Sequence, residues 1–313
     1  MGPSDKPLPL SKREDGVWTV SAGPFEPNVY SYGYIVNGVR VPLDPSSPTT
    51  LISANRYASS SFLIPGKPPK AWELRPVPRG TVHIHYFRST RQDRDRPYYV
   101  YTPPDYERET GRVYPVLILL PGTPGSEADW VSSGLANRIF DNLLADHAMQ
   151  PMVVMMPRAD VMTQTGTRAE NLREFEPLLI NEILPDFEPR YHVEKKPEAR
   201  AIAGYSLGGE LAVTVGLRHP ELFGAIGSFD GSLFEEDFAD RFGTVLEKPE
   251  VVRTYRVLWI GCGLGDLFLP GSRKLDEILK TKNIPHTLRE IPGFHVTSTF
   301  RSLLVEFLPT LFH

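Results

Sequence analysis

The chain has 313 residues, which exceeds one average domain of roughly 100 to 200 residues. Hydrophobic residues make up 41% of it and charged residues 23%, so the chain can bury a full core, and disorder is not indicated. A formal net charge of -4, spread along the sequence, argues against nucleic acid or an anionic membrane as a partner and favours a neutral or weakly charged substrate.

The first part of the sequence reads as short strands broken by turns. Strand-like runs are expected at 17–20 and 29–36, and Asn37-Gly38 after the second run is a strong hairpin signal. A loop rich in proline and serine follows at 42–48. These signals predict a small β domain over residues 1–66.

The pattern changes after a proline-rich linker at 67–80, and a second domain is expected over 81–313. Two alternating runs, 81–88 and 96–101, predict an antiparallel pair of strands. Apolar runs typical of strands buried on both faces then occur at 114–120, 152–156, 199–203 and 257–260. Helix-compatible stretches lie at 135–147, 170–187, 210–218, 272–283 and 298–308. This alternation predicts an α/β fold with a mostly parallel central sheet and helices on both faces.

A glycine-flanked serine lies where a predicted strand meets a predicted helix. The sequence Gly204-Tyr205-Ser206-Leu207-Gly208 follows the third apolar run and precedes a helix-compatible stretch. A strand, a sharp turn and a helix form the setting of a nucleophile elbow, where close approach of neighbouring chains excludes a β-carbon beside the serine. An ordinary glycine turn with a capping serine can have the same pentapeptide. The predicted strand before it and helix after it are therefore the stronger argument for Ser206 as a nucleophile.

A serine hydroxyl is a weak nucleophile, so a histidine must take its proton, and in this fold the chain order is serine, acid, histidine. Asp266 lies just past the last apolar run, and His295 lies in the loop before the last predicted helix. Asp230 is the competing acid. His219 and His286 are the competing histidines, although His219 suits a helix end and His286 suits a short strand.

Ester cleavage passes through an oxyanion that needs at least two hydrogen-bond donors, each worth roughly 3 kcal/mol. The Leu207 amide is the expected first donor. Thr123, in the loop after the first apolar run, is the preferred second donor, because Pro124 beside it has no N–H to offer; a plain tight turn is the alternative for this loop. No cofactor is expected. His83 and His85 alternate on one strand without further ligands nearby, so no metal site is predicted.

Together these residues resemble an esterase group of the α/β-hydrolase fold that includes bacterial feruloyl esterases, enterochelin esterases and D-type esterases. The segments that carry the resemblance are 98–106, 201–209, 263–275 and 292–295. The resemblance covers nearly the whole chain and implies a serine carboxylesterase that uses Ser206, Asp266 and His295. Where the group usually has His-Gly in the oxyanion loop, this chain has Pro121-Gly122.

The N-terminal segment resembles part of an immunoglobulin-like module of the carbohydrate-binding type. Residues 8–64 carry this similarity, and the first strands of such a module are absent, which predicts a small or truncated β-sandwich-like domain. Aromatic residues in strands more often form core contacts or cross-strand pairs than sugar platforms. Four residues are open to either interpretation: Trp18, Tyr30, Tyr32 and Tyr34.

The resemblance favours feruloyl (hydroxycinnamoyl) esters of plant polysaccharide as substrates, followed by acetyl-xylan or aryl esters and then a siderophore lactone. An acyltransferase and a catalytically inert glycan-binding protein are the rivals. The expected partner is a small-molecule or polysaccharide-linked ester, with no nucleic acid and no membrane, and the oligomeric state stays open, a homodimer included. We expect a secreted or periplasmic protein whose leader is absent from this chain, with a cytoplasmic location as the alternative, since residues 1–5 lack signal-peptide features.

Overall fold

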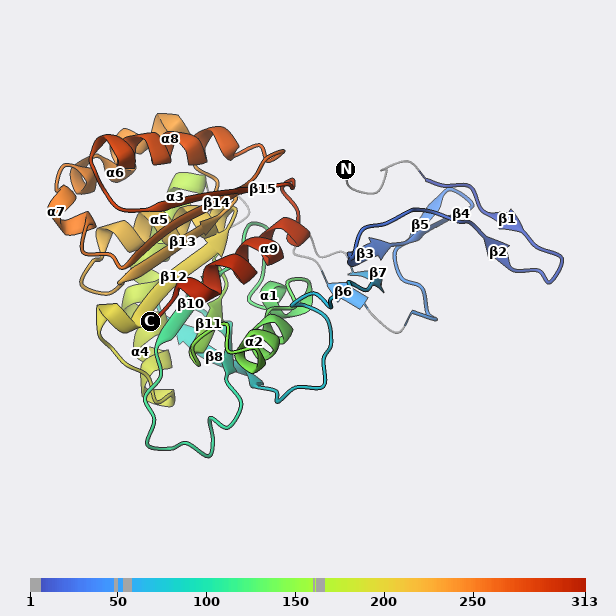
Figure 1. Ribbon diagram of the computed structural model, residues 1–313, viewed down its shortest axis with the longest axis horizontal. Coiled ribbons are helices and arrows are strands. Elements are labelled where there is room, and N and C mark those ends of the chain that lie inside the picture. The colour runs from blue at the N-terminus through green and yellow to red at the C-terminus, as the bar shows by residue number, and fades with distance from the viewer. Residues whose placement is uncertain (1–6, 48–49, 53–57, 160, 162–166) are drawn as a thin grey trace.

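The computed structural model describes residues 7–47, 50–52, 58–159, 161 and 167–313. The start of the chain, where no signal peptide was recognised, and residue 48 of the proline-rich loop lie outside these ranges. Within them, the chain forms one large sheet wrapped by helices, with small antiparallel sheets of N-terminal strands to one side (Figure 1). No helix of these residues combines the length and the apolar character needed to cross a bilayer.

The central sheet is mostly parallel, as predicted. Its spatial order is β15-β14-β13-β12-β10-β11-β9-β8, and β10 to β15 run parallel while β9 and β8 pair antiparallel at one edge. The strands are β8 (Thr81–Ser89), β9 (Arg94–Thr102), β10 (Val116–Leu120), β11 (Val153–Pro157), β12 (Arg200–Tyr205), β13 (Ala225–Phe229), β14 (Val257–Gly263) and β15 (Thr287–Ile291).

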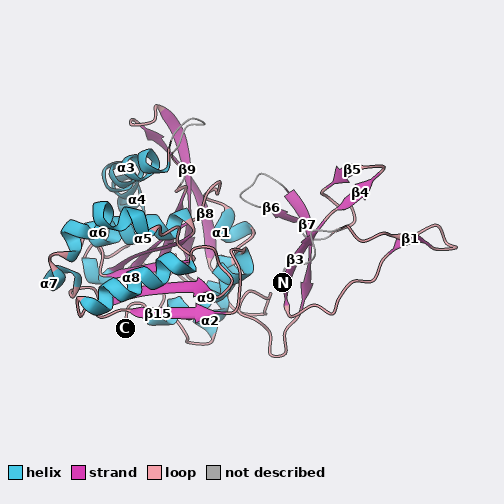
Figure 2. Ribbon diagram, turned by 90° about the horizontal axis from the view of Figure 1, so that it is seen from above, coloured by secondary structure: helices cyan, strands magenta, loops and turns pink. Residues whose placement is uncertain are grey.

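Helices cover both faces of this sheet (Figures 1 and 2), because alternate side chains of each strand point to opposite faces. On one face lie α3 (Arg168–Leu178), a π-helical turn (Leu179–Ile183), α4 (Leu184–Phe187), α5 (Leu207–Arg218), α6 (Phe238–Leu246), α7 (Pro249–Val252) and α8 (Leu269–Thr281). On the other lie α1 (Asp129–Ser132), α2 (Ala136–Ala145) and α9 (Thr297–Phe307). Short 3-10 turns occupy Glu188–Arg190, Pro197–Ala199, Glu235–Asp237 and Leu308–Thr310.

Two central elements differ from the sequence-based expectation. β13 was not recognised because glycine and serine interrupt its apolar character, yet all its residues are buried, and a β-carbon on Gly227 would lie 2.7 Å from the Phe307 ring. The helix expected over 170–187 is divided by the π-helical turn. Pro185 follows that turn, and its nitrogen cannot donate the hydrogen bond that an uninterrupted helix needs there.

The N-terminal strands form three small antiparallel groups, β1 with β2, β3 with β7 and β6, and β4 with β5. Their bounds are β1 (Ser11–Lys12), β2 (Trp18–Thr19), β3 (Asn28–Tyr32), β4 (Tyr34–Val36), β5 (Val39–Val41), β6 (Thr50–Ile52) and β7 (Ala58–Ile64). The Asn37-Gly38 hairpin is confirmed, since both residues have positive φ, 51° and 79°, between the paired strands β4 and β5. The domain boundaries at 66 and 80 stay a prediction.

The single strand expected over 29–36 is wrong, because the chain breaks at Gly33 and enters a different sheet. A β-carbon on Gly33 would lie 3.1 Å from the Val41 carbonyl oxygen, so glycine suits this crossing of chains. The aromatic residues on β3 form contacts within the small sheet. Tyr30 and Tyr32 pack on Phe62 with ring centroids 5.6 and 6.0 Å apart, whereas Trp18 is 60% exposed.

Candidate active site

Ser206, Asp266 and His295 lie in loops that follow three parallel strands, β12, β14 and β15. The carboxyl ends of parallel strands meet at one edge of a sheet, which is where α/β proteins place their sites. The β12 and β14 strands flank β13, and β15 pairs with β14. Side chains separated by 89 residues in sequence therefore meet at this edge.

Ser206 occupies a sharp turn between β12 and α5. Its backbone angles are φ 54° and ψ -123°, outside the regions that residues with a β-carbon normally occupy, so the surrounding packing must hold it there. Glycine is required on both sides. A β-carbon on Gly204 would lie 2.6 Å from the Leu120 carbonyl oxygen, and one on Gly208 would lie 2.4 Å from that of Pro121. The Ser206 N–H donates to the Phe229 carbonyl at 3.1 Å, which ties the turn to β13.

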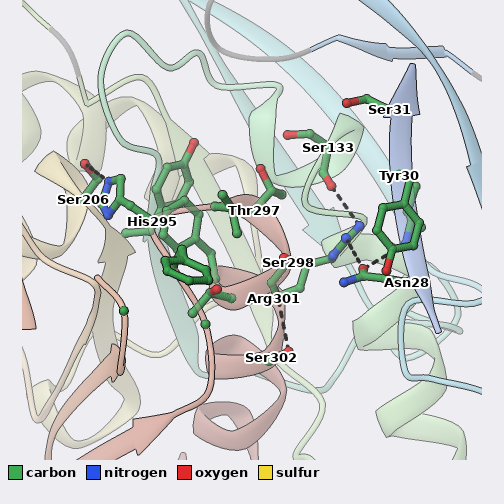
Figure 3. A pocket seen from close by; sticks show the side chains of 18 of the residues that line it. Asn28, Tyr30, Ser31, Ser133, Ser206, His295, Thr297, Ser298, Arg301 and Ser302 are labelled. Carbon is green, nitrogen blue, oxygen red and sulfur yellow. Dashed lines mark hydrogen bonds between the residues drawn. The ribbon is translucent and has the colours of Figure 1, made fainter. Parts of the chain in front are cut away.

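The three side chains form a continuous hydrogen-bonded chain. His295 Nδ1 lies 2.8 Å from Asp266 Oδ2, and His295 Nε2 lies 3.0 Å from Ser206 Oγ (Figure 3 shows the serine and the histidine). A carboxylate can only accept, so Nδ1 carries the proton of a neutral imidazole and Nε2 accepts from the serine hydroxyl. Asp266 Oδ1 in turn accepts from the Phe268 N–H at 2.8 Å. This arrangement can activate a hydroxyl for attack.

Two aromatic rings pack against the His295 imidazole, one from a residue before it in the sequence and one from a residue after it. The Phe268 and Phe300 rings meet it edge to face, with centroids 5.2 and 5.1 Å away and interplanar angles of 72° and 75°. Phe300 also stacks on Tyr205, the residue before the serine, at 4.3 Å. Neither ring was predicted from the sequence. Phe268 lies in a segment that carries the family resemblance and Phe300 lies outside those segments, but aromatic spacing alone does not indicate which residue is a neighbour in space.

The competing acid and histidines occupy other positions. Asp230 is fully buried at the end of β13, and its Oδ1 accepts from the Gly263 N–H at 2.6 Å rather than from a histidine. His219 bonds two glutamates at a helix end, as expected. His286 pairs with Asp276 at 3.0 Å and with a backbone carbonyl. Of the candidates that the sequence left open, only Asp266 and His295 are brought to Ser206.

Asp230, Cys262 and Asp266 are the described residues whose types and proximity could hold a cation, with ligand atoms within 4.8 Å of one another. Asp266 already receives two hydrogen bonds, one of them from His295. These hydrogen bonds engage both carboxylate oxygens of Asp266.

The loop after β10 packs directly against the serine. A β-carbon on Gly122 would lie 2.8 Å from the Ser206 β-carbon and 2.7 Å from the Tyr205 ring. Thr123 lines the same cavity as Ser206, and Leu207 is the first residue of α5, directly after the serine. The Tyr205 hydroxyl donates to Asp129 at 3.1 Å. Burial raises the pKa of Tyr205, so its hydroxyl keeps its proton.

Ser206 and His295 open into a cavity of about 1030 Å³ that the N-terminal strands help to enclose. Residues of β3 form one wall, and α9 with the loop before it forms another (Figure 3). Aromatic side chains from both parts line the cavity: Tyr30, Tyr205, Phe294 and Phe300. Tyr30 was expected only as a residue of the N-terminal domain, since nothing local to β3 indicates the active site.

Arg301 on α9 connects the two walls of the cavity. Its guanidinium is almost fully buried, donates to Asn28 Oδ1 of β3 at 2.8 Å and to the Ser133 carbonyl at 3.3 Å, and lies over the Trp72 ring at 5.2 Å. Figure 3 shows the arginine reaching from the helix to β3. The buried Nε of Arg301 has no partner among the described residues, so the guanidinium depends on the two hydrogen bonds to Asn28 and Ser133. These bonds connect β3 to the helix that follows His295.

Comparison with known proteins places the chain in a family. The family model described as "Putative esterase" matches residues 89–311, which is more than half of the chain and includes all three hydrogen-bonded residues. The chain belongs to this esterase family. Membership supports carboxylic ester hydrolysis as the chemistry of the site.

Two curated relatives illustrate the match. An endo-1,4-beta-xylanase/feruloyl esterase of Xylanibacter ruminicola is 30% identical over 263 residues, covering 81% of this chain and 34% of the relative. Esterase Rv1288 of Mycobacterium tuberculosis is 26% identical over 244 residues, covering 63% of this chain and 52% of the relative. The chain thus spans about a third to a half of the length of these relatives.

Solved structures share the fold at lower sequence identity. A ferulic acid esterase superposes with a TM-score of 0.67 and 22% identity, covering 74% of this chain and 97% of the other. The ferulic acid esterase of Anaeromyces mucronatus gives 0.62 and 21%, covering 78% and 95%. The enterobactin esterase of Shigella flexneri gives 0.63 and 21%, covering 85% and 68%. These likenesses establish the α/β-hydrolase fold.

Proposed function

We propose that the esterase is a serine carboxylesterase acting on feruloyl esters of plant polysaccharide, with Ser206, His295 and Asp266 as its catalytic residues. The observation that carries the proposal is the hydrogen-bonded chain of these residues, which ends in a cavity with aromatic walls. An ester is cleaved by such a chain when a carbonyl carbon reaches the serine oxygen.

In the proposed reaction, Ser206 Oγ attacks the ester carbonyl while His295 Nε2 takes the hydroxyl proton. Asp266 stabilises the resulting imidazolium through the hydrogen bond from Nδ1. The imidazolium then gives its proton to the departing alcohol, which leaves an acyl group on Ser206. Water, activated by the same histidine, releases the acid and restores the serine.

The oxyanion of the tetrahedral intermediate is proposed to bind the backbone amides of Leu207 and Thr123. The Leu207 amide points from the start of α5, where unpaired N–H groups and the helix dipole favour a negative charge. Thr123 lies on the cavity wall, and the Gly122 beside it packs on Ser206. Each such donor is worth about 3 kcal/mol of transition-state stabilisation.

The choice of a feruloyl substrate rests on the cavity and on the relatives. A planar hydroxycinnamoyl group can stack on rings such as Tyr205, Phe300 and Phe294, which lie beside the serine. The named activities of the Xylanibacter relative and of two structural neighbours include feruloyl ester cleavage. A substrate attached to insoluble polysaccharide cannot enter a cell, so the proposal implies that the protein acts outside it.

A substrate panel tests this function. Hydrolysis of methyl ferulate, acetyl-xylan and enterobactin is measured with the wild-type protein and with Ser206→Ala at equal concentration. We expect methyl ferulate to give the highest kcat/KM, and Ser206→Ala to abolish turnover. Faster cleavage of acetyl-xylan or enterobactin would contradict the substrate assignment. Failure to cleave any of the three esters would contradict the proposal that the protein is an esterase.

Product analysis with an added sugar acceptor distinguishes hydrolysis from acyl transfer. Free ferulic acid in proportion to the alcohol released is expected for the proposed esterase. A feruloylated acceptor as the main product would instead make the protein a transferase.

A further inference from the structure

Asp230 is a buried carboxyl group that the proposed mechanism does not use. It directly follows β13, is fully buried, and donates its backbone N–H to the Gly261 carbonyl of β14 at 2.8 Å. Its φ of 46° lies in the left-handed region, which aspartate adopts more readily than most residues. The fold therefore fixes this side chain at the ends of β13 and β14, in the cluster with Asp266.

The hydrogen bonds of the two carboxyl groups leave one oxygen without a donor. Asp266 accepts from His295 Nδ1 and from the Phe268 N–H, both at 2.8 Å. Asp230 Oδ1 accepts from the Gly263 N–H at 2.6 Å, and the Cys262 thiol, a weak donor, also bonds this carboxyl. The buried Oδ2 receives no N–H or O–H from the described residues. An ionised carboxylate would need a donor at Oδ2, whereas a protonated carboxyl brings its own proton.

The surroundings of Asp230 favour the protonated form. Its carboxyl oxygen, one of Asp266 and the Cys262 sulfur lie within 4.8 Å of one another. Burial, reinforced by the charge of Asp266, raises the pKa of Asp230 well above its ordinary value of 3.8. Burial also raises the pKa of the Cys262 thiol, which therefore adds no charge. Of the described residues, Asp266 is the charged group whose field acts on Asp230.

We propose that Asp230 is a positioning residue whose carboxyl proton is directed at Asp266 and holds that carboxylate in place for His295. The inference rests on the proposed function, because it takes Asp266 as the acid that stabilises the imidazolium. One proton shared by two carboxyl groups leaves the pair with a single negative charge. That charge matches the single positive charge that His295 acquires when it takes the serine proton.

Substitutions at position 230 test the role of the proton. Asp230→Asn presents an N–H₂ group where the carboxyl proton would be, whereas Asp230→Ala presents no donor. We expect the alanine variant to lower kcat for a small aryl ester about tenfold or more with KM little changed, because an unsupported Asp266 no longer orients His295. The asparagine variant should restore kcat to within about threefold of the wild-type value.

Cys262→Ala is the control for packing, since it removes the neighbouring buried thiol, whose hydrogen bond with Asp230 is a weak one, and leaves both carboxyl groups in place. Its kcat should stay within about twofold of the wild-type value. The proposal is overturned if the asparagine variant is as slow as the alanine variant, which would make Asp230 act as an anion. It is also overturned if Cys262→Ala is as slow as Asp230→Ala, which would reduce the effect to packing.

Infrared difference spectroscopy at about pH 6 detects the proton without any turnover. The wild-type protein should show the C=O stretch of a buried protonated carboxyl, and Asp230→Asn should lack it. Absence of that band from the wild-type protein overturns the proposal. Ser206→Ala should retain the band, so a failure of the proposed esterase activity is distinguishable from a failure of this inference.

Discussion

Asp266 holds His295 through a hydrogen bond of 2.8 Å between the carboxylate and Nδ1. A second aspartate–histidine pair, Asp276 with Nε2 of His286 at 3.0 Å, has its other ring nitrogen on a backbone carbonyl instead of a serine. The two pairs show that what distinguishes the site is the third group, Ser206 Oγ, 3.0 Å from His295 Nε2.

The first prediction compares these two pairs. Asp266→Asn should lower kcat for a small aryl ester by about 10³ to 10⁴, because the amide favours the wrong tautomer of His295 and cannot stabilise the imidazolium. Asp276→Asn, the matched control, should leave kcat within about twofold. Steady-state kinetics of both variants checks the assignment, and a large loss in the Asp276 variant would contradict it.

The sequence predicted those residues of the site that have a local sequence pattern. Ser206 has a local signature, because a strained turn forces glycine at fixed positions around it. The order serine, acid, histidine then limited the candidates, and the family resemblance favoured Asp266 and His295. Local pattern alone could not separate Asp266 from Asp230, since each follows one of two neighbouring strands, β13 and β14, at the same edge of the sheet.

Other parts of the site have no local signature. Phe268, Phe300 and Tyr30 reach the imidazole or the cavity only through tertiary packing, so aromatic residues in loops, helices and an N-terminal strand gave no hint of one another. Long apolar runs predicted most central strands. The strand β13 has glycine and serine at its centre, and the Phe307 ring that packs on Gly227 explains why a glycine lies in this buried strand.

The second prediction concerns the loop that packs on the serine. Gly122→Ala should lower kcat by about 10² or more, because its β-carbon would lie 2.8 Å from that of Ser206 and would displace the proposed oxyanion loop. Gly111→Ala is the control, since a β-carbon there meets nothing within 4 Å. Kinetics with an aryl ester and a thermal unfolding curve for each variant separate catalysis from folding. Wild-type kcat in Gly122→Ala would refute the close approach.

The third prediction concerns the wall formed by β3. Tyr30 and Tyr32 on the same strand both pack on Phe62, but Tyr30 also lines the cavity, whereas Tyr32 donates to Asp44. Tyr30→Ala should raise KM for feruloylated oligosaccharide about threefold to tenfold through lost contact, with kcat for a small aryl ester unchanged. Tyr32→Ala should leave both values unaltered. Equal KM values for the two variants would contradict a role of Tyr30, and thus of the β3 wall, in substrate binding.

The fourth prediction concerns stability and pH at His219. Hydrogen bonds to Glu176 and then Glu221 raise the pKa of His219 above its ordinary value of 6.5. The protonated form therefore stabilises the folded state below about pH 6.5, and this contribution is lost as pH rises through the raised pKa. His219→Gln should lower the free energy of unfolding by about 1 kcal/mol at pH 5.5 and by less at pH 9. Urea unfolding at both pH values measures it, and an equal loss at each would contradict the ion pair.

The most direct test of the central claim is to label the protein with a fluorophosphonate and map the adduct by peptide mass spectrometry. The account predicts one stoichiometric adduct on Ser206, loss of ester hydrolysis in proportion to labelling, and no adduct in the His295→Ala variant at the same exposure. An adduct on another residue, or full hydrolysis after complete labelling of Ser206, would contradict it.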